Sequence, residues 1–248
     1  MNKDAHWLLT EKYDGVATSD YFDDCQRLEA GEPLAYLIGH VPFLGCTIWL
    51  DSKPLIPRSE TEFWTDHVIH HIKKSPYRDV TLQILDLCAG SGCIGVAIAK
   101  HLPLAHVDFN ELEFTHLPTI KKNCQANDIV LGRVHIGAGN LFSELDPEVK
   151  YDHIVSNPPY IDPELNRTDL SVMAHEPAIA LYGGAGGLAL ITAIILYAPD
   201  FLKPGGTIWV EHEPEQTAAI RDLAAKKFTV STHRDQYHLE RFSELVLQ

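Results

Sequence analysis

The sequence predicts an α/β fold built on a doubly wound, mostly parallel β-sheet. From residue 82 onward, short apolar strand patterns alternate with helical patterns, and this alternation is typical of parallel sheets with helices on both faces. The C-terminal stretch, KKFTVSTHRDQYHLERFSELVLQ, instead contains two strand patterns joined by a polar loop. It predicts an antiparallel hairpin at one edge of the sheet. A chain of 248 residues is long enough for one such domain with a small appendage.

Shorter elements are predicted ahead of the sheet. Residues 3–13 and 20–30 have helical spacing, with Ser19 as a candidate N-cap and Gly31 as a stop signal. Residues 41–56 alternate short apolar runs with glycine and proline, which predicts a β-hairpin or an extended connector. The stretch SETE, from Ser59 to Glu62, has the spacing of a capping box and predicts a helix from there to about Lys74.

The sheet region is expected to alternate strands and helices in order along the chain. Strands are predicted over residues 82–87, 105–110, 132–137, 151–156 and 206–211. Helices are predicted over residues 92–101, 112–127, 187–202 and 215–226.

Charge and composition limit the classes of partner and compartment. Twenty basic and 34 acidic residues give a net charge of −14, which disfavours direct nucleic-acid binding and favours a basic protein partner. No apolar run reaches the roughly 18 residues of a membrane span, and the start lacks the order of a signal peptide. Five cysteines without a C-x-x-C pair predict neither a disulfide framework nor a metal site. We therefore expect a cytoplasmic protein that binds no membrane.

The first candidate ligand loop lies in ILDLCAGSGCIG, where a strand pattern leads into glycines. Ligands bind beyond the carboxyl ends of such strands. Gly90-x-Gly92-x-x-Gly95 matches a dinucleotide fingerprint, with Glu111 about 20 residues further on. The match fits a nicotinamide enzyme and an S-adenosylmethionine enzyme alike, because both bind an adenosine. Asp86 favours the methyl donor, since its carboxylate could meet the methionyl ammonium directly or through water.

The second candidate loop is IVSNPPYID, which also follows a strand pattern. Proline restricts its own φ and the conformation of the preceding residue, so Asn157-Pro158-Pro159 forms a rigid bracket. The Asn157 side chain and the Pro158 carbonyl are two fixed acceptors that suit a planar NH2 group with two N–H donors. The ring face of Tyr160 would favour the positive charge that develops when such a nitrogen is methylated.

These motifs carry a family resemblance. DLCAGSGCIG followed by NPPY resembles the amino-methyltransferases that use S-adenosylmethionine. Together with GEPLAYLIGHVPFLG, LIPRSETE, IVSNPPYI and EPAIALYGGAGGLALI in this order, the chain resembles the release-factor glutamine methyltransferases (the HemK/PrmC family) from about Gly31 to its end. The resemblance implies transfer of a methyl group from S-adenosylmethionine to the glutamine of the Gly-Gly-Gln motif of a peptide-chain release factor. It also implies a Rossmann-like sheet of seven strands.

The resemblance further implies a division of the chain and a role for each motif residue. Residues 1–40 would form a short helical segment that docks the substrate, 41–58 a β-hairpin connector, and 59–248 the methyltransferase domain. The positions expected to bind the cofactor, besides Asp86, are Cys88, Ala89, Gly90, Ser91, Gly92, Glu111, Asn140, Leu141 and Asn157. The positions expected to bind the substrate are Asn157, Pro158, Pro159 and Tyr160, of which Asn157, Pro158 and Tyr160 are assigned to catalysis.

Several alternatives stay open at the level of sequence. Asp108 is a rival to Glu111 as the ribose-binding acid, and Asn140 stands where the family usually has an acid. Arg58 and Glu62 could border the cleft, although Glu62 is equally explained as a helix cap. The run from Tyr182 to Gly187 is either a lid over the bound amide or a plain loop. A DNA or RNA adenine-N6 methyltransferase and a non-catalytic S-adenosylmethionine-binding module are the two alternative functions.

Overall fold

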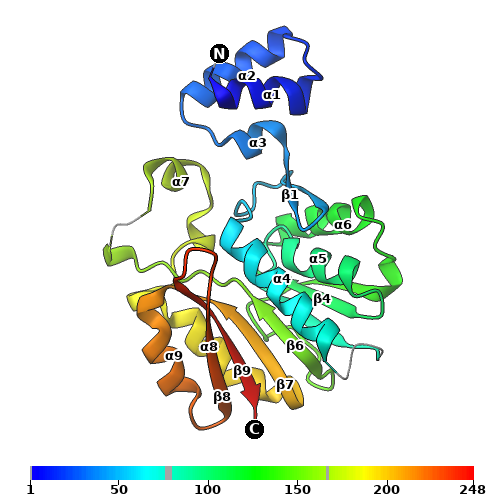
Figure 1. The fold of residues 1–248 in the computed structure, drawn as a ribbon, viewed down its shortest axis with the longest axis vertical. Helices are drawn as coiled ribbons and strands as arrows, with labels where there is room; N and C mark the ends of the chain where they lie inside the picture. The colour runs from blue at the N-terminus through cyan, green and yellow to red at the C-terminus, as the bar shows by residue number, and fades with distance from the viewer. Residues whose placement is uncertain (1, 76–79, 166–167) are drawn as a thin grey trace.

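A seven-stranded sheet forms the centre of the computed structural model, which describes residues 2–75, 80–165 and 168–248 (Figure 1). Its strands are β3 (Gln83–Leu87), β4 (His106–Glu111), β5 (Val134–Ala138), β6 (Tyr151–Ser156), β7 (Leu202–Glu211), β8 (Phe228–Arg234) and β9 (Glu240–Leu247). Their order in the sheet is β5-β4-β3-β6-β7-β9-β8. The pairs from β5 to β7 are parallel, whereas β9 pairs antiparallel with both β7 and β8. The predicted fold class, including the antiparallel edge, is confirmed.

The strand order places two loops of interest side by side. From β3 the chain moves outward to β4 and β5, and then returns to the other side of β3 with β6. The carboxyl ends of β3 and β6 therefore flank the point where the winding reverses, which is where doubly wound sheets bind ligands. The glycine loop follows β3 and the bracket at Asn157 follows β6.

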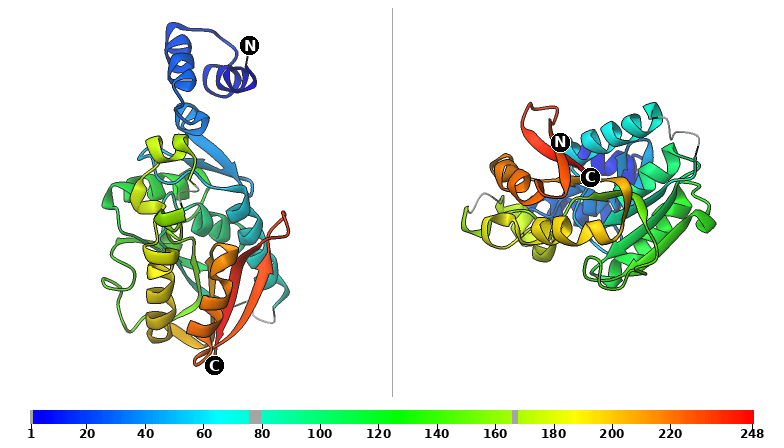
Figure 2. Two further views of the ribbon diagram at one scale, coloured as in Figure 1. Left: turned by 90° about the vertical axis from the view of Figure 1, so that its left-hand side faces the viewer. Right: turned by 90° about the horizontal axis from the view of Figure 1, so that it is seen from below.

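Helices cover both faces of the sheet (Figures 1 and 2). They are α4 (Ser59–Lys74), α5 (Cys93–His101), α6 (Leu117–Ala126), α8 (Ala189–Tyr197) and α9 (Thr217–Ala224). In β3, Ile84 packs in the core that contains Trp64 of α4, whereas Leu85 packs in the core that contains Ile194 of α8. A parallel strand buried on both faces divides its side chains between two cores in this way.

The N-terminal part forms a small unit of its own, which projects away from the sheet (Figure 2). Helices α1 (Lys3–Tyr13), α2 (Ser19–Glu29) and α3 (Leu34–Ile38) enclose a separate core of Leu8, Tyr21 and Leu37. The N-cap of α2 is Thr18 and not Ser19, because the Thr18 side chain accepts a hydrogen bond from the Tyr21 N–H. Strands β1 (His40–Phe43) and β2 (Cys46–Trp49) then form the predicted hairpin.

The expected capping box at Ser59 is not formed. Helix α4 begins after Arg58 without a side-chain cap, and the Ser59 hydroxyl donates to Glu60. The Glu62 carboxylate instead accepts from the backbone N–H of Leu44 at 2.7 Å. Leu44 lies in the hairpin turn with a φ of 46°, so Glu62 ties α4 to the β1–β2 hairpin.

Other boundaries shift where turns replace regular helix. Helix α6 begins only at Leu117, after a 3₁₀ turn (Phe114–His116). Helix α8 ends at Tyr197, and a second 3₁₀ turn (Ala198–Asp200) with a proline leads directly into β7. Helix α7 (Leu170–His175) lies in a stretch where the sequence predicted no element. Within residues 2–75, 80–165 and 168–248, no helix has the length and apolar character needed to cross a bilayer.

Candidate active site

The main cavity, of about 400 Å³, opens at the carboxyl ends of β3, β4 and β6. Small-molecule sites usually span ~300–1,000 Å³. The predicted cofactor positions that line it are Cys88, Ala89, Gly90, Ser91, Glu111, Asn140, Leu141 and Asn157. Asp86 and Gly92 do not line it.

Three residues of the glycine loop have a left-handed backbone conformation: Cys88 (φ 62°), Gly90 (φ 55°) and Gly92 (φ 76°). The backbone N–H groups of Cys88 and Ala89 both donate to the Asn110 carbonyl, which holds the loop against β4. A Cβ built on Gly90 would meet nothing within 4 Å, so the loop backbone is open on that side. A Cβ on Gly92 would approach Ile120 to 3.0 Å. Gly90 thus leaves room for a ligand, whereas Gly92 permits close packing.

Glu111 joins the ends of two loops on the cavity wall. Its Oε2 accepts from the Gly90 N–H at 2.7 Å, and its Oε1 accepts from the Glu113 N–H at 2.9 Å. Asp108 lies three residues earlier on β4 and outside the cavity lining, where it accepts from the Tyr151 hydroxyl at 2.8 Å. The structure therefore brings Glu111 to the cavity and keeps the rival acid away from it.

Asp86 lies behind the cavity wall and is fully buried. Its Oδ2 accepts from the Gly95 N–H at 2.8 Å, while its Oδ1 has no partner among the described residues. Burial raises the pKa of this carboxyl to about 8, and Glu111 adds to the shift. In this position the Asp86 carboxylate cannot contact a ligand in the cavity directly. A contact through water stays a prediction.

The bracket lies between the main cavity and a second one. Pro159 lines the main cavity, whereas Pro158 and Tyr160 line a side cavity of about 310 Å³. Of the described residues that line both cavities, Asn157 is the polar one. Its Nδ2 donates to the Thr61 hydroxyl oxygen at 3.1 Å, and within the part of the chain that the structure describes its Oδ1 is available as an acceptor.

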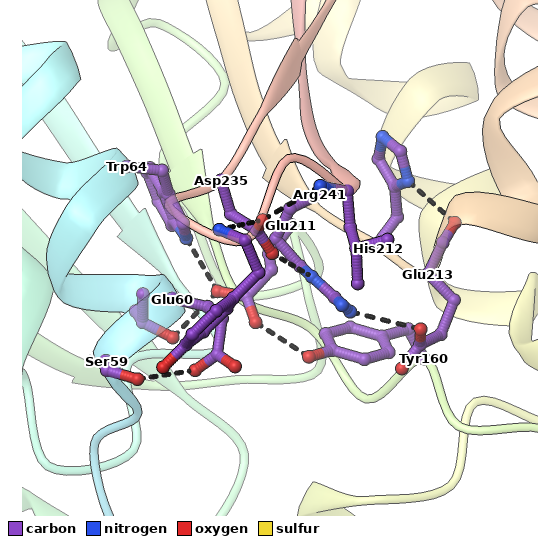
Figure 3. A network of polar contacts seen from close by, with 12 residues as sticks. Ser59, Glu60, Trp64, Tyr160, Glu211, His212, Glu213, Asp235 and Arg241 are labelled. Carbon is purple, nitrogen blue, oxygen red and sulfur yellow. Dashed lines mark hydrogen bonds and ion pairs between the residues drawn. The ribbon is translucent and has the colours of Figure 1, made fainter.

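Tyr160 is held at its backbone and at its hydroxyl. The Gln216 side-chain amide donates to the Tyr160 carbonyl at 2.8 Å. A Cβ on Gly187 would lie 1.8 Å from the same carbonyl oxygen, so only glycine fits there. The Tyr160 hydroxyl donates to Glu211 at 2.7 Å (Figure 3), and burial raises the Tyr160 pKa. The hydroxyl therefore has a structural role beside the one predicted for the ring face.

Glu211 is a site residue that the sequence analysis missed, as are Asn110 and Glu113 in the lining of the main cavity. Glu211 ends β7 and is 1 % exposed. Besides the Tyr160 hydroxyl, its carboxylate accepts from the Thr61 hydroxyl at 2.7 Å and from Trp64 Nε1 at 2.6 Å. Burial raises the Glu211 pKa, and these three donors oppose the shift. An acidic residue at the carboxyl end of a predicted parallel strand was the available signal.

Residues before, within and after α7 line the side cavity, and Glu176, which directly follows this helix, is tied to the segment before α4. The Glu176 side chain is 1 % exposed and pairs with the Arg58 guanidinium at 2.6 Å. Its other oxygen accepts from the Ile56 N–H at 3.0 Å. Arg58 therefore borders the side cavity, as one reading of the sequence allowed. Tyr182 and the two glycines after it form part of the main cavity wall.

Comparisons with known proteins identify the family of this chain. A family model described as the methyltransferase small domain matches residues 60–175. The release factor glutamine methyltransferase of Francisella tularensis is 42% identical over 197 residues, which cover 79% of this chain and 67% of that protein. The release factor glutamine methyltransferase of Bordetella pertussis is 34% identical over 249 residues, which cover 98% of this chain and 89% of that protein. The chain belongs to the release factor glutamine methyltransferase family.

Solved methyltransferases that are more distant from this family share the fold alone. A methyltransferase from Pyrococcus furiosus superposes with a TM-score of 0.59 at 15% identity, covering 91% of this chain and 98% of that one. The 16S rRNA N2 G1207 methyltransferase of T. thermophilus, solved with AdoMet and guanosine, gives a TM-score of 0.59 at 18% identity. It covers 84% of this chain and 49% of that one. Family membership, predicted from four ordered motifs, is confirmed by the two release factor glutamine methyltransferases and not by these structures.

Proposed function

We propose that this protein transfers a methyl group from S-adenosylmethionine to the side-chain amide nitrogen of the glutamine in the Gly-Gly-Gln motif of a peptide-chain release factor. The observation that carries the proposal is the position of Asn157 at the boundary of two cavities. The main cavity has the size of a cofactor site and is lined by the glycine loop. The side cavity would let the glutamine side chain of the substrate reach the Asn157 amide. Family membership supplies the class of reaction.

The residues of the main cavity fit the proposed cofactor. S-adenosylmethionine supplies an electrophilic methyl group on a positively charged sulfonium. Among the described residues the lining contains Glu111 and Glu113 but neither lysine nor arginine. This charge suits a cationic cofactor and disfavours the pyrophosphate of a dinucleotide. Asn110 also lines the cavity, while its Oδ1 is buried in the wall and has no partner in the described part of the chain.

Each wall segment is assigned one part of the cofactor. Glu111 would bind the ribose hydroxyls, since each of its oxygens keeps one lone pair after accepting a backbone N–H. Residues 88–92 would surround the methionyl part with their backbone, and Asn140 with Leu141 would lie at the adenine. Asn140 can accept from the adenine amino group without carrying a charge.

The bracket is assigned the substrate amide. The Asn157 Oδ1 and the Pro158 carbonyl would accept the two N–H groups and so fix the direction of the nitrogen. Orientation of this kind can remove ~7–11 kcal/mol of an activation barrier, and an amide nitrogen is a poor nucleophile that depends on it. Residues 1–40 are proposed to dock the release factor. The net charge of −14 would attract a basic factor, and we propose a cytoplasmic location.

The test is methyl transfer from labelled S-adenosylmethionine to a purified release factor. We expect label in the wild-type factor and none in a factor whose Gly-Gly-Gln glutamine is replaced by alanine. Duplex DNA and structured RNA serve as competing substrates in parallel reactions. Label in either nucleic acid, or persisting label in the alanine factor, would contradict the proposed substrate.

A further inference from the structure

We propose that Glu211 and Thr61 are positioning residues that keep the Asn157 amide turned with its oxygen toward the substrate. The inference rests on the proposed function, in which that oxygen accepts a hydrogen bond from the substrate NH2 group. The three residues come from different elements: Glu211 ends β7, Thr61 lies in the first turn of α4, and Asn157 follows β6. A side-chain amide presents either an acceptor or a donor, depending on how it is turned.

The hydrogen bonds between these residues run in one direction. Asn157 Nδ2 donates to Thr61 Oγ1 at 3.1 Å, and Thr61 Oγ1 donates to Glu211 Oε2 at 2.7 Å. A hydroxyl has a single proton. Because the Thr61 proton is given to Glu211, Thr61 has only lone pairs left for Asn157. The amide must therefore turn its NH2 group to Thr61, which leaves its oxygen on the opposite side.

The carboxylate of Glu211 sets this direction because it accepts hydrogen bonds only. The Trp64 indole N–H, which cannot accept, donates to the same Oε2 atom at 2.6 Å. Tyr160 donates to Oε1 at 2.7 Å, so both oxygens are occupied as acceptors (Figure 3). Burial raises the Glu211 pKa, and the three donors together with the positive charge of Arg241, which lies behind this cluster, oppose that shift and favour the ionised form.

Arg241 is itself held by two carboxylates. Its Nη1 pairs with Glu213 at 3.0 Å, and its Nε pairs with Asp235 at 3.2 Å (Figure 3). The direction of the Asn157 amide is thus determined by a buried polar cluster built from β7, α4 and the C-terminal hairpin. If the direction were reversed, the Asn157 NH2 group would meet the substrate NH2 group, donor against donor.

The first variant in the test combines Glu211→Gln with Trp64→Phe, which adds a donor at position 211 and removes the indole N–H that would otherwise keep an oxygen facing Thr61. The glutamine NH2 group can then face Thr61, so that the Thr61 hydroxyl turns its proton toward Asn157 and the amide reverses. We expect kcat to fall at least about tenfold, in line with the cost of a misoriented reactant. The dissociation constant of S-adenosylmethionine and the KM of the release factor should each change less than about threefold.

A set of threonine variants separates positioning from packing. Thr61→Val keeps the volume and removes the hydroxyl, so kcat should fall, whereas Thr61→Ser keeps the hydroxyl and should restore most of it. Thr65→Val is the matched control. Thr65 is as buried as Thr61 and lies one turn further along α4, but its hydroxyl donates to the helix backbone at the Thr61 carbonyl. This control should retain wild-type kcat.

Two outcomes contradict the inference. The first is wild-type kcat in both the Glu211→Gln/Trp64→Phe variant and Thr61→Val, which refutes the positioning role while wild-type methylation of the release factor upholds the proposed function. The second comes from the double variant with Asn157→Ala. If Thr61 acts through Asn157, Thr61→Val should lower kcat no further in that background. A further loss equal to that of the single variant would show a general structural effect instead. Absence of methylation by the wild-type protein would overturn the proposed function and this inference together.

Discussion

Replacing Asp86 with asparagine should make the stability of this protein less dependent on pH. The Asp86 carboxyl is fully buried and accepts one hydrogen bond, from the Gly95 N–H. Burial raises its pKa from 3.8 to about 8. Because the folded pKa lies above the unfolded value, the stabilisation is fully present below about pH 4 and is lost as pH rises through about 8.

The size of the stability change follows from the pH range between the unfolded and folded pKa values of Asp86. Between the two pKa values, the free energy of unfolding falls by roughly 1.4 kcal/mol for each pH unit. From pH 5 to pH 7, wild type should therefore lose about 3 kcal/mol relative to Asp86→Asn. Asparagine has nearly the shape of the neutral acid, so other titrating groups cancel when the two proteins are compared.

The assay is urea unfolding of both proteins at pH 5, 6 and 7, followed by circular dichroism. A stability difference that stays constant across this range would refute the buried, proton-binding state of Asp86. A second measurement links this state to the cofactor. A cationic ligand near Asp86 favours the carboxylate, so S-adenosylmethionine binding at pH 7 should release protons in wild type and none in Asp86→Asn. Calorimetry in buffers of different ionisation enthalpy measures this release.

Two further predictions concern binding. Glu111→Ala should weaken S-adenosylmethionine binding by ~1–3 kcal/mol, because a charge-assisted bond to the ribose is lost. Asp108→Ala, outside the cavity, should leave the affinity nearly unchanged; calorimetry giving the opposite ranking would move the ribose site to Asp108. Added salt should lower kcat/KM for a basic release factor at constant kcat, because it screens the attraction of a chain with a net charge of −14. Steady-state kinetics from low to high salt checks this, and a salt-independent kcat/KM would contradict it.

Local rules in the sequence were sufficient for the fold class and for the loops that form the site. The period of apolar residues predicted the strands that became β3 and β6, and parallel strands must present their carboxyl ends at one edge. Glycines at 90 and 92 allow the left-handed backbone that the loop needs, and prolines at 158 and 159 restrict the backbone around themselves. These effects act over short stretches of chain, so they can be predicted from the sequence alone.

The tertiary structure alone decided which polar groups meet. Whether Glu111 or Asp108 reaches the cavity depends on the side of β4 that each occupies. Glu62 found its partner in the hairpin turn at Leu44, although its local spacing predicted a cap. Glu211 accepts from Thr61 across 150 positions of sequence. Such contacts depend on strand register and on how α4 packs against the sheet, and no local pattern specifies either. The high pKa of Asp86 has the same origin, because burial is a property of the packed molecule and not of the residues beside it in the chain.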